Sequence, residues 1–124
     1  MEGKMAERKE KTAGEMGFEI LANFIGCSAE LLNDMEKIKS ILLDVAGKAG
    51  FTQVGECFYK FEPQGVTGIV LLAESHLSVH TWPEFGSAAV DIFSCAGKEN
   101  AERALILLKD AFKPRRVTVH RIER

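Results

Sequence analysis

The sequence predicts an α+β protein, a two-layer sandwich in which two helices cover one face of a largely antiparallel β-sheet. Two amphipathic helical segments and six short strand-like segments, in the order β-α-β-β-β-β-α-β, indicate this class. Four of the strands follow one another with short links. Strands joined in this way run antiparallel, because parallel neighbours need long crossovers.

The first strand is expected at 17–25, where apolar residues occupy alternate positions. Apolar residues then recur at helical spacing and predict a first helix at about 34–49. Asn33 followed three residues later by Glu36 resembles a capping box at its start. Gly50 is expected to end this helix in a left-handed conformation.

The second half of the chain predicts the remaining strands and the second helix. Four strands with short turns between them are expected at 51–61, 66–73, 76–81 and 88–95. Asn100 is expected to be the N-cap of the second helix, and Pro114 ends it because proline lacks a backbone N–H. A last strand is expected at 116–122.

Composition excludes several classes of protein. The 124 residues carry a net charge of −2, so the basic face of a nucleic-acid binder is not expected. Residues 1–16 are charged and lack an apolar period, which predicts a disordered tail before a single domain at 17–124. The apolar run near the start is too short to span a membrane and does not resemble a signal peptide, so we expect a cytoplasmic protein.

Three cysteines (Cys27, Cys57 and Cys95) and three histidines form no recognisable disulfide or zinc-binding spacing. Reduced thiols and no metal site are the expectation.

The segment 74–95, ESHLSVHTWPEFGSAAVDIFSC, concentrates reactive side chains on what is otherwise strand-like sequence. Taken singly, each has an ordinary structural explanation. A lone Ser75 is usually a turn or strand serine, His80 a satisfied structural histidine, and Cys95 a buried thiol. Trp82 would usually be packing, and Glu84 a solvated charge. Their combination is therefore the informative feature.

Together with PQGVTG at 63–68, this segment resembles the prokaryotic S-adenosylmethionine decarboxylase proenzyme family. The motifs ESHL, HTWPE and DIFSC stand at the spacings found in this family. The resemblance extends more loosely over nearly the whole chain. It implies a pyruvoyl-dependent, self-processing enzyme. Such an enzyme converts S-adenosylmethionine to S-adenosyl 3-(methylsulfanyl)propylamine and CO₂, which supplies aminopropyl groups for spermidine and other polyamines.

The resemblance implies autocatalytic cleavage of the bond between Glu74 and Ser75, giving chains 1–74 and 75–124. In the family the serine hydroxyl attacks the preceding carbonyl and the serine becomes the pyruvoyl group, the covalent cofactor. A hydroxyl eight residues upstream, here Thr67, assists this step. A histidine five residues downstream, here His80, removes the Cα proton. Because residues 75 and 80 would face opposite sides of a regular strand, a bend near Ser75 is expected.

The same resemblance implies how the substrate is held. The pyruvoyl carbonyl forms a Schiff base with the substrate amine and accepts the electrons released by decarboxylation. Cys95 then returns a proton. Phe61 and Trp82 stack on the adenine, and Glu84 binds the ribose hydroxyls. Relatives form dimers, so a homodimer of cleaved protomers is expected.

Two alternatives stay open at this point. A pyruvoyl-dependent arginine decarboxylase of the same fold would share the processing residues, although Phe61, Trp82 and Glu84 fit a nucleoside better than a guanidinium. A non-enzymatic α+β interaction domain would keep an intact chain without a carbonyl-reactive group. Assays of CO₂ release from each substrate and the mass of the purified chain discriminate among the three.

Overall fold

The computed structural model describes residues 15–124, so most of the expected tail at 1–16 lies outside the described residues. Within the described part, no helix has the length and apolar character to span a membrane. The elements run in chain order as β1 (Phe18–Ile25), α1 (Ala29–Leu32), α2 (Met35–Lys48), β2 (Gln53–Lys60), β3 (Val66–Leu72), β4 (Ser75–Trp82), the 3₁₀ turn η1 (Pro83–Phe85), β5 (Ser87–Ser94), α3 (Lys98–Phe112) and β6 (Arg116–Glu123).

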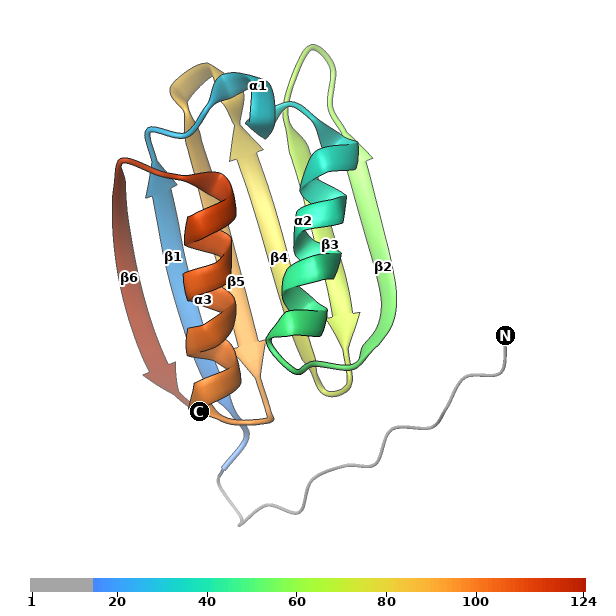
Figure 1. The fold of residues 1–124 in the computed structure, drawn as a ribbon, viewed down its shortest axis with the longest axis vertical. Helices are drawn as coiled ribbons and strands as arrows, with labels where there is room; N and C mark the ends of the chain where they lie inside the picture. Colours follow the sequence, from blue (N-terminus) through green and yellow to red (C-terminus); the bar gives the residue numbers. More distant parts are fainter. Residues whose placement is uncertain (1–14) are drawn as a thin grey trace.

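A six-stranded sheet forms one layer, with the strand order β2-β3-β4-β5-β1-β6. Every neighbouring pair is antiparallel. Helices α2 and α3 lie side by side across one face of this sheet, and α1 lies at one end (Figure 1). The predicted α+β class and two-layer architecture are therefore confirmed, and the sheet is wholly antiparallel over the described residues.

The core lies between the sheet and the two long helices. Strands β1, β3, β4 and β5 place every second side chain in this layer, as a period of two requires. Phe24 from β1 meets Phe112 from α3 edge to face, with ring centroids 5.7 Å apart. The side chains of the alternate positions form the opposite side of the sheet, which no helix of residues 15–124 covers. We call it the open face; it includes Glu19, Tyr59, Thr67, Leu71, His76, His80, Trp82, Asp91, Phe93 and Ile122.

The start of α2 differs from the prediction. Its N-cap is Asp34, whose Oδ1 accepts a hydrogen bond from the Lys37 N–H at 3.0 Å. The predicted capping box at Asn33 is therefore wrong. Asn33 instead ends the short helix α1, which the sequence pattern did not reveal because four residues carry no period. The predicted end of α2 is confirmed, since Gly50 has a φ of +90°.

The start of α3 also differs from the prediction. The helix begins at Lys98, after Gly97 as N-cap, so Asn100 lies within the first turn. The Asn100 side chain donates from Nδ2 to the Ala49 carbonyl at 2.9 Å and so ties α3 to the end of α2. A tertiary contact has replaced the expected capping role. The helix ends at Phe112, before Pro114 as predicted.

Candidate active site

The bond between Glu74 and Ser75 lies at the tip of the β3–β4 hairpin. Leu72 pairs with Ser75, so Ala73 and Glu74 form the connecting turn. Glu74 has a φ of +61°, in the left-handed region. A residue with a Cβ pays about 1–2 kcal/mol for this conformation. The proposed cleavage bond therefore follows a strained residue directly.

Ser75 and Cys95 lie next to each other at this end of the sheet. Ser75 is the first residue of β4 and is buried, with 7% of its surface exposed. Its Oγ accepts a hydrogen bond from the Cys95 backbone N–H at 2.9 Å. A pocket of about 190 Å³ opens here, between the hairpin, Cys95 and the segment 50–52 that follows α2. The hairpin brings together two residues that are twenty positions apart in sequence.

Thr67 and His80 form a second pair, on the open face. The β3–β4 register places them directly opposite each other, and Thr67 Oγ1 lies 2.9 Å from His80 Nδ1. Either group can donate this hydrogen bond, depending on the tautomer of the imidazole. The His80 ring is exposed and lies 6.4 Å from the Trp82 ring. A hydroxyl and an imidazole are thus held as one unit.

The three residues expected to bind substrate line a single pocket of about 330 Å³. Phe61 comes from the loop after β2, Trp82 from the end of β4, and Glu84 from η1. Phe61 and Trp82 are each 44% exposed, so both rings are accessible to a ligand. The pocket therefore combines aromatic surface with a carboxylate.

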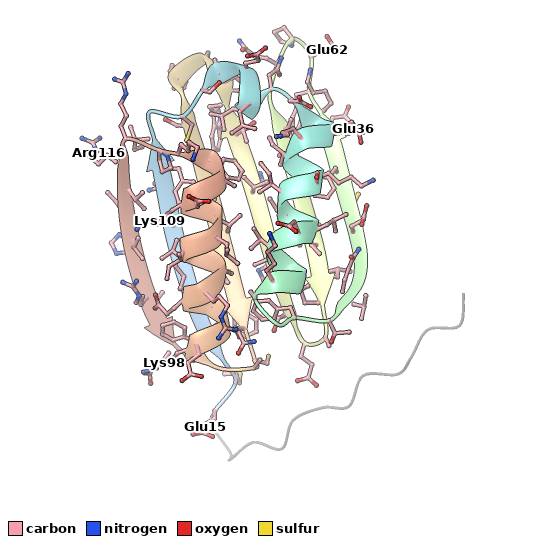
Figure 2. All side chains as sticks on the ribbon, viewed as in Figure 1. Glu15, Glu36, Glu62, Lys98, Lys109 and Arg116 are labelled. Atoms are coloured by element: carbon pink, nitrogen blue, oxygen red, sulfur yellow. The ribbon has the colours of Figure 1, made fainter. Side chains whose placement is uncertain are left out.

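The residues predicted for one site divide into two groups at opposite ends of the sheet. The β3–β4 turn lies at the lower end of Figure 1, whereas the β2–β3 and β4–β5 connections lie at the upper end. In Figure 2 the labelled Glu62 marks the upper loop, and Lys98 marks the lower end. The first group contains Ser75 and Cys95, and the second contains Thr67, His80 and the Phe61–Trp82 pocket.

The expected bend near Ser75 is absent, because β4 keeps an unbroken register with β3 and β5. Ser75 therefore faces the helices, whereas His80 faces the open side. At a rise of about 3.3 Å per residue, five residues separate their Cα atoms by roughly 16 Å. Within one chain, His80 cannot reach the Cα proton of Ser75.

Asp91 lies in the middle of the open face, opposite Ser78 of the neighbouring strand. Burial raises the pKa of the Asp91 carboxyl, and the nearby Glu19 carboxylate raises it further. His76 and His80 oppose this shift in pKa. Sequence reasoning missed this group, although an acid within the apolar strand AAVDIFS is a visible signal.

Comparison with known proteins decides the family. A model of the S-adenosylmethionine decarboxylase family matches residues 18–124. S-adenosylmethionine decarboxylase proenzymes from Pelotomaculum thermopropionicum and Moorella thermoacetica are 44% and 46% identical to this chain. Each match spans 88% of this chain, and 86% and 87% of the respective relative. The crystal structure of adenosylmethionine decarboxylase from Aquifex aeolicus is 37% identical and has a TM-score of 0.85, covering 90% of this chain and 92% of that one.

The chain belongs to the S-adenosylmethionine decarboxylase family.

Membership of the S-adenosylmethionine decarboxylase family confirms the resemblance seen in the sequence. It also makes the chain a member of an enzyme family, which removes the support for a non-enzymatic interaction domain. Among residues 15–124, no three His, Cys, Asp or Glu side chains are grouped so that they could hold a metal ion.

Proposed function

We propose that this protein is the proenzyme of a cytoplasmic decarboxylase that acts on S-adenosylmethionine after cleaving itself between Glu74 and Ser75. Its product would supply aminopropyl groups for spermidine and other polyamines. The observation that carries the proposal is the contact between Ser75 and Cys95 at the strained hairpin, in a chain of this family.

In the proposed self-cleavage, Ser75 Oγ attacks the Glu74 carbonyl carbon and the peptide C–N bond breaks, which leaves an ester and a free amine. Thr67 assists as a hydrogen-bond donor to the oxygen that becomes negative. His80 then removes the Ser75 Cα proton, the ester C–O bond breaks, and Glu74 departs as a carboxylate. This elimination leaves a dehydroalanine, an enamine that becomes an imine by taking up a proton on its terminal carbon. Water then adds to the imine, which releases ammonia and leaves a pyruvoyl group.

The residues around Ser75 fit such a group. Its neighbour Cys95 has a partly exposed side chain, and the adjoining pocket of about 190 Å³ leaves room on the turn side. The pyruvoyl carbonyl supplies the electron sink for decarboxylation. We assign to the Cys95 thiol the role of holding a proton for the substrate carbon that loses CO₂, because Cys95 is a proton-bearing side chain directly beside Ser75.

The pocket of Phe61, Trp82 and Glu84 is proposed to hold the nucleoside part of the substrate. The two aromatic side chains offer surfaces on which adenine stacks, and they also attract the neighbouring sulfonium cation. The Glu84 carboxylate can accept hydrogen bonds from both ribose hydroxyls. A guanidinium can also stack on an aromatic ring and pair with a carboxylate, but arginine has neither an adenine nor a ribose diol to occupy this pocket.

The proposed reaction requires two copies of the chain, because one copy separates Ser75 from His80. A twofold axis that lies between two open faces and runs across the strands reverses the strand direction. The hairpin end of one copy then lies against the His80 and Trp82 end of the other. Each complete site would combine Ser75 and Cys95 of one copy with the second group of its partner, after the Ser75 side chain has turned from the helical side toward the interface.

A mixing experiment tests this arrangement. Ser75→Ala lacks the nucleophile and His80→Ala lacks the base, so each variant alone should remain unprocessed. When the two variants are co-expressed with different tags, a mixed dimer has one complete site. That site contains Ser75 of the His80→Ala chain and His80 of the Ser75→Ala chain, so the His80→Ala chain should be cut. Intact-mass measurement of each tagged chain reads this directly. Failure of the pair to cleave, while the wild type does, would contradict the two-copy site.

The activity itself is tested by CO₂ release from carboxyl-labelled substrates. Purified protein should consist of two chains, the second beginning with a group that blocks Edman sequencing. It should release CO₂ from S-adenosylmethionine and not from arginine. An intact chain with full activity, or release from arginine alone, would overturn the proposal.

A further inference from the structure

The Thr81 hydroxyl joins three segments beneath the Phe61–Trp82 pocket. Thr81 is only 6% exposed. Its Oγ1 accepts a hydrogen bond from the Val66 N–H at 2.9 Å and donates to the Leu32 carbonyl at 2.7 Å. One hydroxyl thus satisfies a buried donor at the start of β3 and a buried acceptor at the end of α1. Removing it would leave both backbone groups unsatisfied.

Asn33, the residue after Leu32 at the end of α1, makes a second hydrogen bond to the same loop. Its Oδ1 accepts a hydrogen bond from the Gly65 N–H at 2.9 Å. The Gly65 carbonyl in turn accepts from the Phe61 N–H at 2.8 Å, which closes the loop that carries the Phe61 ring. The end of α1 therefore holds this loop at two consecutive residues, Gly65 directly and Val66 through Thr81.

The two walls of the pocket meet at Thr81. On one side, Thr81 precedes Trp82 in the chain, so its position along β4 sets where the indole lies. On the other side, its hydroxyl holds the loop from which Phe61 projects. Thr81 and Gly65 also line the pocket themselves. A shift in this hydroxyl contact would change the separation of the two aromatic side chains.

We propose that Thr81 is a positioning residue for substrate affinity, which, with the help of Asn33, fixes the gap between Phe61 and Trp82 into which a flat base fits. This inference rests on the proposed function of that pocket. Thr81 takes no part in proton transfer or cleavage, because the Thr81 hydroxyl faces the helices, away from Thr67 and His80. Its effect is therefore on binding and not on the chemical steps.

The test uses the self-processed protein and the fluorescence of Trp82, which is the only tryptophan in the chain. The probe is 5′-methylthioadenosine, which has the adenine and ribose but no amine that could react with a carbonyl. It should quench Trp82 in the wild type. Thr81→Val keeps the shape and removes the hydroxyl. The dissociation constant of Thr81→Val for the probe, and its KM for S-adenosylmethionine, should each rise by about tenfold. This factor corresponds to about 1.4 kcal/mol of binding free energy, lost because the two hydrogen bonds of the hydroxyl are gone.

Readouts besides affinity separate positioning from a general loss of structure. In Thr81→Val, kcat and the rate of self-cleavage should stay within about twofold of the wild type, because the chemical groups are untouched. Thr81→Ser keeps the hydroxyl and should restore affinity. Asn33→Ala should weaken binding in the same direction, and Asn33→Asp, which keeps an acceptor, should not. If Thr81→Val fails to fold, the Asn33 pair carries the test.

Wild-type affinity in both Thr81→Val and Asn33→Ala would overturn this inference and leave the proposed function intact. Equal losses in kcat and self-cleavage would also overturn it. If the probe fails to quench Trp82 in the wild type, the assignment of the pocket to the nucleoside is wrong, and the inference fails with it.

Discussion

At the scale of the residue, the thiol of Cys95 is expected to act only after Ser75 has been converted. Cys95→Ala should self-cleave at the normal rate, because the nucleophile of that step is Ser75. Decarboxylation should then fall by about 10²- to 10⁴-fold, the usual contribution of a positioned proton donor. The measurement is turnover divided by the titrated amount of pyruvoyl group, together with a melting curve.

Cys57→Ala is the matched control, because this thiol lies on the edge strand β2, three strands away from β5, which precedes Cys95. It should leave both steps unchanged. If Cys95→Ala lowers the melting temperature but keeps its turnover per pyruvoyl group within about threefold of the wild type, well short of the contribution of a proton donor, the thiol is only a packing residue.

The raised pKa of Asp91 predicts how the stability of the protein changes with pH. Burial is the main reason that the pKa of its carboxyl is raised in the folded protein. Between the unfolded pKa of about 3.9 and the raised folded pKa, the folded state binds more protons than the unfolded state. The contribution of Asp91 to the free energy of unfolding therefore becomes less favourable as pH rises through this window. Asp91→Asn should be more stable than the parent at neutral pH.

The gain from Asp91→Asn should shrink toward zero as pH falls to about 3, where the unfolded carboxyl, with a pKa of about 3.9, is also largely protonated. Urea unfolding at fixed protein concentration, in a Ser75→Ala background that keeps one chain, measures the difference. A gain that is independent of pH would show that the charge of Asp91 is not its cause.

At the scale of the element, β2 is held on β3 by a close contact between Phe58 and Gly68. These two residues pair across the strands, and a Cβ on Gly68 would lie 2.1 Å from Phe58 Cδ2. Gly68→Ala must therefore displace the ring and should lower the free energy of unfolding by about 1–3 kcal/mol. Urea unfolding in the Ser75→Ala background measures this cost.

Gly47→Ala provides the opposite case. Gly47 lies within α2, and nothing stands within 4 Å of a Cβ built there. Since alanine favours a helix over glycine by about 1 kcal/mol, this variant should be more stable. If Gly68→Ala and Gly47→Ala changed the free energy of unfolding in the same direction by similar amounts, the assigned contact between Phe58 and Gly68 would be contradicted.

At the scale of the whole molecule, one side of the sheet is covered by helices and the other is proposed to meet a second copy. Leu71 is 49% exposed on the open face. A lysine there would be buried against the partner, so Leu71→Lys should shift the protein to monomers and stop self-cleavage. Analytical ultracentrifugation and intact mass report the two effects.

Ile106→Lys is the matched control for Leu71→Lys. Ile106 is 64% exposed on α3, on the helical side of the molecule. This variant should keep both the dimer and self-cleavage. A wild-type protein that is monomeric and fully processed would contradict the two-copy arrangement.

The sequence by itself determined the fold class, the order of the six strands and the two long helices, and the family. Hydrophobic period and turn residues are local properties of the chain, and the motif at 74–95 is specific enough to identify without coordinates. Only the tertiary structure decided which of these residues meet. Pairing with two neighbouring strands keeps β4 regular, so Ser75 and His80 face opposite sides instead of meeting at a bend. The side chains of Asn33 and Asn100 likewise do not cap the helices as expected. Each forms a hydrogen bond with a backbone group more than thirty residues away. The physical reason is that side chains such as these can satisfy either a local or a distant backbone group, and only the packed fold determines which.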